Sequence, residues 1–165
     1  MLGKWGTGMM EDRLEQVRQA VDDILRQQPD GTLARCGFVH LYGVSAVCVL
    51  LAEKRGLDAE LCAVAGMLHD ISSYKLGDST NHARLSAIEA DRILDESRLF
   101  ADDEIAQITD AVSKHCAKDE TDDTVAELLK DADVLQHYLY DPGLEITCTD
   151  RLERILAELG LEEDQ

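Results

Sequence analysis

Helical periodicity runs through nearly the whole chain and constrains the fold more than any other feature. Between residues 11 and 28, apolar side chains recur every three or four positions on one face, with charged side chains opposite. Similar patterns continue, with short interruptions, to residue 159. We predict helices over about 11–28, 38–55, 59–68, 82–96, 103–116, 124–140 and 151–159.

Turn and capping residues separate these helices. Pro29-Asp30-Gly31 ends the first helix, Gly56 ends the second, and Asp58 can cap the third. Other candidate caps are Ser79, Thr80 or Asn81 and Asp102 or Asp103. The segment 72–80 is rich in turn residues and has no period, so we predict a loop there.

The composition agrees with an all-α fold. Two prolines and 4 % aromatic residues argue against a β-sandwich, and 165 residues suffice for one domain. We therefore predict a single all-α domain over 11–165, a bundle of about six to seven helices. Residues 1–10 contain no apolar run, so we interpret them as a flexible or vector-derived leader and not as a signal peptide.

Charge and cysteine usage limit the partners and the compartment. The 34 acidic residues exceed the 16 basic ones, giving a net charge of −18, which repels duplex nucleic acid. An anionic substrate would therefore need a local cation. No stretch approaches the roughly 18 uncharged apolar residues of a membrane span, so no membrane partner is expected. The five cysteines form no C-x-x-C pair, which favours small buried hydrophobes in a reducing cytoplasm.

Three histidines fall on the apolar faces of different predicted helices. His40 precedes Val44 by one turn, His69 ends the third helix, and His115 continues the apolar stripe of the fifth. A single histidine on such a face is most often a hydrogen-bonded core residue. Three of them directed to one interior need a common partner, because each unsatisfied buried nitrogen costs roughly 1–3 kcal/mol.

Two carboxylates accompany these histidines. Asp70 directly follows the apolar run that ends at His69, and Asp133 borders the buried face of the sixth helix. A buried carboxylate is costly unless it is paired or bound to a metal. Imidazole plus carboxylate, without thiolate, is the ligand set of Zn, Mn, Fe, Ni or Co and not of Ca.

The order and flanks of these residues resemble the HD superfamily of metal-dependent phosphohydrolases. Residues 65–71 read AGMLHDI, which is similar to the AGLLHDI segment of that family. Residues 130–135 read KDADVL, which resembles its DADxL segment. The resemblance covers a motif-bearing core of about residues 36–140 and implies an HD-type helical bundle.

The resemblance also implies a ligand set and catalytic residues. The four positions that match the ligands of the first metal are His40, His69, Asp70 and Asp133. His82 and His115 resemble the further histidines of subfamilies that hold two metals, in which the counterpart of Asp70 bridges both ions. Asp70 and His69 are then the expected catalytic residues. The implied cofactor is one or two divalent ions of Fe, Mn, Zn, Ni or Co, with Mg also allowed.

Several departures from the family leave the substrate open. Ile71 is not followed by the Gly and Lys of the HDIG pattern, since Lys75 stands two places late. No helper Glu follows Asp70, and no GYP motif is present. Candidate phosphate-binding or substrate-binding side chains are Lys75, Arg84, Lys114, Lys118 and His137. Asp131 is either a hydrogen-bond partner of a ligand or a solvated surface carboxylate.

The sequence therefore predicts a phosphoric ester hydrolase that uses a metal-activated water. The expected substrate is a small phosphorylated metabolite, with a nucleotide as the leading choice, cleaved at a phosphomonoester, phosphodiester or anhydride bond. Two alternatives stay open: a non-catalytic sensor of metal or nucleotide, and a di-iron oxygenase of the HD type. A homodimer is compatible with the sequence, but no interface can be located.

Overall fold

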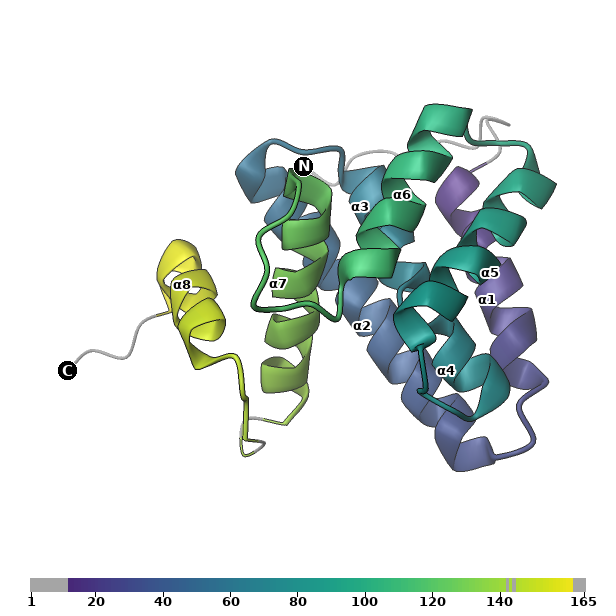
Figure 1. The fold of residues 1–165 in the computed structure, drawn as a ribbon. Helices are drawn as coiled ribbons and strands as arrows, with labels where there is room; N and C mark the ends of the chain where they lie inside the picture. Colours follow the sequence, from purple (N-terminus) through teal and green to yellow (C-terminus); the bar gives the residue numbers. More distant parts are fainter. Residues whose placement is uncertain (1–11, 142, 144, 162–165) are drawn as a thin grey trace, which may run out of the picture.

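Eight α-helices make up the part of the chain that the computed structural model describes, residues 12–141, 143 and 145–161, and no strand occurs there (Figure 1). In chain order they are α1 (Arg13–Arg26), α2 (Gly31–Arg55), α3 (Ala59–Leu68), α4 (Ile71–Leu76), α5 (His82–Ser97), α6 (Asp102–Lys114), α7 (Thr124–Tyr140) and α8 (Thr149–Leu159). The all-α prediction is confirmed. The predicted leader, residues 1–10, lies outside the described residues.

Aspartate side chains begin half of these helices. Each accepts a hydrogen bond from a backbone amide in the first turn, which satisfies a donor that has no partner within the helix. These caps are Asp12 for α1, Asp30 for α2, Asp58 for α3 and Asp123 for α7. Because Asp30 caps α2, this helix begins at Gly31 and not near Phe38 as predicted.

The start of α6 differs from the prediction. The N-cap is Ala101, and neither Asp102 nor Asp103 fills that position, because both already lie within the helix. The Glu104 carboxylate accepts a hydrogen bond from the Ala101 amide at 2.8 Å and closes the first turn. The acidic composition predicted that a carboxylate closes the first turn, but it could not show that Glu104 does so and not Asp102 or Asp103.

The short helix α4 replaces the first half of the predicted 72–80 loop. Ile71 and Ser72 are buried, and the Ser72 hydroxyl donates to the His82 carbonyl at 3.0 Å, which ties α4 to the start of α5. Gly77 ends the helix with a left-handed backbone, φ 69°. Contacts with α5 stabilise this helix. Because the helix has no apolar periodicity of its own, the sequence did not predict it.

The long helix α2 lies at the centre of the core and packs against α3 and α7. Gly66 of α3 sits directly on its backbone: a β-carbon at this position would lie 2.9 Å from the Ser45 α-carbon and 3.0 Å from the Ser45 nitrogen. Since backbone cannot move aside as a side chain can, only glycine permits this spacing of the two helices. The spacing in turn sets the distance between His40 on α2 and His69 at the end of α3.

Substitution of Gly66 by alanine is expected to destabilise the protein by about 1–3 kcal/mol, the usual cost of overpacking a core. The added methyl group would force α2 and α3 apart at Ser45. Urea denaturation measures the change. Gly31→Ala is the matched control, because a β-carbon there meets nothing within 4 Å. Equal stability of the Gly66→Ala variant and the wild type would contradict this packing.

By length and hydropathy alone, α2 could cross a membrane, contrary to the sequence expectation, and it is the one such helix among the described residues. Half of its most apolar stretch is buried within the molecule. Val44, Cys48 and Leu51 belong to the common core, so packing within the bundle accounts for the apolar character of these positions.

Helix α8 lies beside α7 at the edge of the bundle (Figure 1), and a network of ion pairs joins the two helices. Asp131 of α7 is buried and accepts hydrogen bonds from Arg151 at 2.5 Å and from Arg55 at 2.7 Å. The side chain of Lys130 has no exposed surface and donates to Asp122 at 2.7 Å. Asp131 is therefore neither a partner of a metal ligand nor a solvated carboxylate, the two roles predicted for it.

The cysteines are only partly the buried hydrophobes that the sequence predicts. Cys48 and Cys62 are buried in the core, whereas Cys36 and Cys148 are half-buried and Cys116 is exposed. Burial raises the pKa of the Cys62 thiol to about 11 and that of Cys48 as well, so both stay protonated. Cys116 has surroundings of a different kind, described below.

Candidate metal centre

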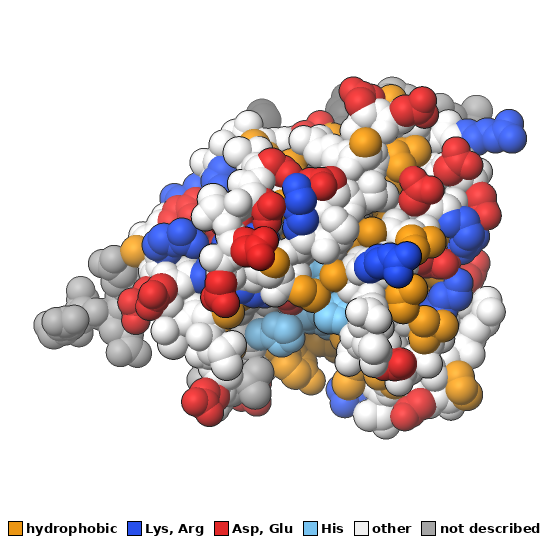
Figure 2. All heavy atoms as spheres, viewed as in Figure 1, with side chains coloured by type: hydrophobic (Ala, Val, Ile, Leu, Met, Phe, Trp, Pro, Cys, Tyr) orange, Lys and Arg blue, Asp and Glu red, His pale blue; other side chains and the backbone are white. Residues whose placement is uncertain are grey.

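All five histidines and two aspartates converge on one region, although they come from different helices. They are His40 of α2, His69 and Asp70 between α3 and α4, His82 at the start of α5, His115 at the end of α6, and Asp133 and His137 of α7. Histidine side chains reach the surface near the middle of the face shown in Figure 2, beside apolar side chains. The six predicted metal ligands are therefore neighbours in space.

The inner group of candidate ligands consists of His40, His69 and Asp133 with one oxygen of Asp70. His40 Nε2 lies 3.1 Å from His69 Nε2, 3.5 Å from Asp133 Oδ1 and 3.6 Å from Asp70 Oδ2. His69 Nε2 lies 3.7 Å from Asp70 Oδ2 and 3.8 Å from Asp133 Oδ1. Four ligand atoms thus surround one small volume.

The outer group faces the second oxygen of the same aspartate. Asp70 Oδ1 lies 3.1 Å from His115 Nε2 and 3.3 Å from His82 Nε2. Its Oδ2 belongs to the inner group, so Asp70 spans both groups with one oxygen in each. This position agrees with the bridging role that the family resemblance implies.

Backbone carbonyls set the orientation of three imidazoles. The Nδ1 atoms of His69, His82 and His115 lie 2.7–2.8 Å from the carbonyl oxygens of Gly66, Ser79 and Val112, each three residues earlier. A carbonyl oxygen can only accept, so each Nδ1 carries the hydrogen and each neutral ring turns an Nε2 lone pair toward Asp70. His40 follows the same pattern, with Nδ1 2.8 Å from Gln136 Oε1.

In this arrangement the lone pairs of the imidazole Nε2 atoms face the lone pairs of the carboxylate oxygens. Asp70 Oδ1 and Asp133 Oδ1 are buried, and neither accepts a hydrogen bond from any described residue. Buried carboxylate oxygens without partners are rare and costly. A divalent cation held about 2.0–2.2 Å from its ligands requires ligand atoms roughly 3.3–3.6 Å apart in a tetrahedron, close to the distances found here. The residues therefore fit a bound cation.

When no cation is bound, protons on the histidines can balance the negative charge of the two carboxylates. Burial disfavours a charged His115, but the adjacent Asp70 outweighs it and, with Cys116, raises the pKa of His115 to about 10. Burial lowers the pKa of His69 to about 3. Burial alone would raise the pKa of Asp70, yet His69, His115 and His40 hold it well below its usual range. In the metal-free protein at neutral pH the Asp70 carboxylate is thus ionised, and a proton on His115 Nε2 takes the place of a cation opposite it.

Cation binding at pH 7 is therefore expected to release protons. Histidine must be neutral to bind a metal, and His115 keeps its proton up to a pKa of about 10. The apparent affinity should increase about tenfold per pH unit, for each proton displaced, until that pKa is reached. Calorimetric titration with Mn²⁺ in two buffers of different ionisation enthalpy counts the protons. A binding enthalpy that is the same in both buffers would contradict the prediction.

Most of the predicted substrate-binding cations lie away from the centre or are already paired. Lys75 forms an ion pair with Glu89 at 2.9 Å, and Lys114 faces Asp110 at 2.6 Å. Arg84 is exposed and makes no ion pair with a described residue. The structure does not bring these three to the cluster, because their helices turn them toward other partners or solvent.

Two of the candidates do lie at the cluster. His137 is 46 % exposed, and its Nδ1 lies 3.4 Å from Asp133 Oδ1. The Lys118 ammonium donates to Asp133 Oδ2 at 2.5 Å and to the His115 carbonyl at 2.7 Å. Burial alone would raise the pKa of Asp133, but His69, Lys118 and His40 hold it below its usual range.

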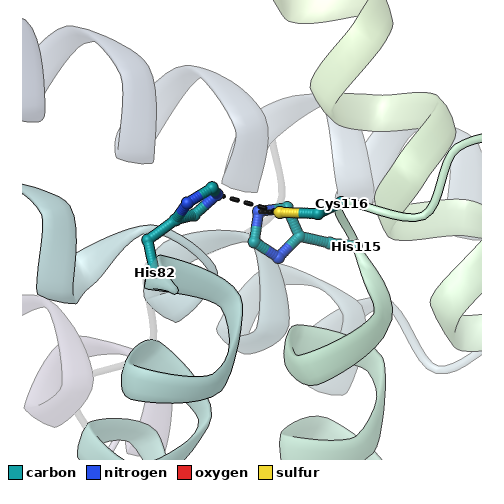
Figure 3. A group of neighbouring side chains, drawn as sticks. All are labelled: His82, His115 and Cys116. Atoms are coloured by element: carbon teal, nitrogen blue, oxygen red, sulfur yellow. Dashed lines mark hydrogen bonds between the residues drawn. The ribbon is translucent and has the colours of Figure 1, made fainter. Parts of the chain in front are cut away.

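Sequence reasoning missed two residues of the site. Gln136 orients His40, and it lies three positions after Asp133, on the same side of α7. Cys116 lies 2.9 Å from His82 Nε2 and 3.4 Å from His115 Nε2 (Figure 3). Its position next to His115 in the sequence was the available signal, but a single cysteine among apolar neighbours suggested a core residue instead.

A small pocket of about 140 Å³ opens beside the inner group. It is lined by Cys36, Val39, His40, Tyr74, Gln136, His137 and Tyr140. A larger cavity of about 390 Å³ lies between α8 and the segment 118–121, and Lys118 lines it. The small pocket is the one that adjoins predicted ligands directly, and two tyrosines give it an aromatic wall.

Comparison with known proteins places this geometry in context. The family model of the HD domain matches residues 37–138, more than half of the chain. A solved structure of a predicted HD superfamily hydrolase from an uncultured Thermotogales bacterium is similar, with a TM-score of 0.57 and 17 % identity over 92 % of this chain and 89 % of that one. This likeness shows a shared fold. No curated protein matches the chain.

Proposed function

This chain belongs to the HD domain family, and on that basis we propose that it is a metal-dependent phosphohydrolase acting on a small phosphorylated metabolite. The observation that carries the proposal is the pair of buried oxygens, Asp70 Oδ1 and Asp133 Oδ1, facing imidazole lone pairs without a hydrogen bond from any described residue. A divalent cation would supply a bound water of lowered pKa and positive charge for the phosphoryl oxygens.

The residues of this chain have separate parts in that reaction. His40, His69 and Asp133 would hold one cation, His82 and His115 a second, and Asp70 would contact both. Backbone hydrogen bonds to Nδ1 hold the rings of His69, His82 and His115 in ligand orientation, so little reorganisation is needed.

Lys118 and His137 are the side chains best placed to contact substrate. The Lys118 ammonium lies at the edge of the inner group, where a phosphoryl oxygen could accept from it. His137 is half exposed beside His40, with 4.8 Å between the ring centroids, and would face the leaving group. Both are among the five side chains that the sequence analysis proposed for substrate binding, whereas Lys75 and Lys114 form ion pairs elsewhere.

A nucleotide is the substrate class that the surroundings favour. The pocket beside His40 has an aromatic wall formed by Tyr74 and Tyr140, which suits a flat ring next to a phosphate. Its volume of about 140 Å³ suits a part of a small metabolite and not a polymer. The net charge of −18 also disfavours a duplex nucleic acid substrate.

Metal removal tests the proposed function. The purified protein is expected to contain a transition metal and to hydrolyse bis(p-nitrophenyl) phosphate or p-nitrophenyl phosphate slowly, with activity lost after chelation and restored by Mn²⁺ or Fe²⁺. A nucleotide panel then ranks substrates. Metal-replete protein that cleaves neither ester nor any nucleotide would overturn the proposal and favour a metal or nucleotide sensor.

A further inference from the structure

Cys116 occupies a position that the ligand set predicted from the sequence does not include. It follows His115 at the end of α6, and its exposed thiol points toward the ring of His82 on α5 (Figure 3). The sulfur lies 2.9 Å from His82 Nε2 and 3.4 Å from His115 Nε2. The three ligand atoms lie within 4.8 Å of one another.

With both rings neutral, the form that binds a metal, hydrogen bonding alone cannot satisfy this group. His82 and His115 each use their Nδ1 hydrogen on a backbone carbonyl, so both Nε2 atoms present lone pairs to the sulfur. A thiol carries one hydrogen and can donate it to one of the two rings. Asp70 Oδ1, 3.3 Å from His82 Nε2 and 3.1 Å from His115 Nε2, adds a further lone pair.

The distances within the group come close to those around a tetrahedral zinc ion. Zinc–nitrogen bonds of about 2.0–2.1 Å and zinc–sulfur bonds of about 2.3 Å require ligand atoms roughly 3.3–3.6 Å apart. The two sulfur–nitrogen and two nitrogen–oxygen separations run from 2.9 to 3.4 Å, at or slightly below this range. Only small side-chain shifts would therefore seat an ion.

The inner and outer groups differ in chemistry. His40, His69 and Asp133 provide nitrogen and oxygen, and His69 is fully buried. The outer group adds a sulfur ligand at the exposed Cys116. Thiolate is a soft ligand that favours zinc over Mn or Mg. Two neighbouring groups that share Asp70 thus differ in the metal they prefer.

We propose that His82, His115, Cys116 and Asp70 Oδ1 form a thiolate-containing zinc subsite, distinct from the nitrogen and oxygen subsite of His40, His69 and Asp133. On binding, the cation displaces the thiol proton of Cys116 and the proton that His115 carries in the metal-free protein, and both protons leave to solvent. This inference rests on the same metal centre as the proposed hydrolase, but its test measures metal binding and not hydrolysis.

Titration of the metal-free 165-residue chain with Co²⁺ under reducing conditions tests the proposal, since Co²⁺ is a spectroscopic substitute for Zn²⁺. Binding should produce a thiolate-to-cobalt charge-transfer band in the near ultraviolet. The Cys116→Ser variant should lack the band while circular dichroism shows an unchanged fold. Cys148→Ser, a half-buried cysteine outside the cluster, is the matched control and should keep it.

A second variant and a competition experiment complete the test. His82→Gln should weaken Co²⁺ binding at this subsite by more than about tenfold. Added Zn²⁺ should remove the band, and added Mn²⁺ should not. Cobalt binding without a charge-transfer band, or a band that persists in Cys116→Ser, would overturn the subsite. Hydrolysis without the band would reject this inference alone, whereas the band without hydrolysis would reject only the proposed function.

Discussion

Replacing Asp70 with asparagine is expected to reduce hydrolysis at least about 10³-fold and to lower the metal content of both groups of ligands. Asp70 is the one residue with an oxygen in each group: Oδ2 lies 3.6 Å from His40 Nε2, and Oδ1 lies 3.1 Å from His115 Nε2. An asparagine keeps the shape of the side chain but removes the negative charge that would balance two bound cations. Elemental analysis and ester hydrolysis measure the two effects.

Two further variants define what the Asp70 result means. Asp95→Asn is the matched control, because Asp95 is exposed on α5, and it should retain both metal and activity. His115→Ala should lower the metal content of the outer group more than that of the inner group, because His115 Nε2 lies 3.1 Å from Asp70 Oδ1, whereas its ligand atom lies only within 4.8 Å of those of His69 and Asp133. An Asp70→Asn protein with full metal content and undiminished hydrolysis would refute the shared role of this carboxylate.

Replacing Lys130 with methionine is expected to destabilise the protein by about 3 kcal/mol and to lower its melting midpoint by roughly 10 °C. The Lys130 ammonium is fully buried and donates to the Glu120 carbonyl, Asp122 and Glu127 at 2.7–3.0 Å. Methionine preserves the volume but leaves these acceptors without their donor. Because the carboxylates keep some contact with water, the cost falls at the lower end of that for a broken buried ion pair.

Lys114→Met provides the control for the Lys130 substitution. Lys114 also faces carboxylates, Asp110 at 2.6 Å and Asp122 at 3.6 Å, but its side chain is 37 % exposed. Exposed ion pairs contribute little to stability, so its melting midpoint should stay close to that of the wild type. Equal midpoints for Lys130→Met and Lys114→Met would show that burial of Lys130 does not matter. Thermal unfolding followed by circular dichroism distinguishes these outcomes.

The helices were largely predictable because their signals are local. The predicted range 124–140 coincides with α7, whose cap at Asp123 and apolar face both lie within a few residues of the helix. Helix α4 was missed for the opposite reason. Its six residues are too few for a periodic pattern, and its stability depends on hydrogen bonds from Ser72 to α5.

The candidate ligands could be identified because several family motifs surround them. Periodicity placed His40, His69 and Asp133 toward the interior, and the flanking residues of His69-Asp70 supplied the family. The substrate cations had no such signal. No sequence feature distinguishes Lys118 from Lys75 or Lys114 as a substrate-binding candidate. Only the fold brings Lys118 to Asp133 and pairs Lys75 with Glu89.

Sequence alone thus established an all-α chain of the HD family and the residues that converge in it, because helix periodicity, capping and short motifs depend on near neighbours. Tertiary structure alone decided that Asp131 and Lys130 are buried in an ion network, that Gln136 orients His40, and that Cys116 meets His82. These contacts join residues of different helices, or a helix to a neighbouring segment. They form only once the helices have packed against one another, and that packing depends on the whole chain.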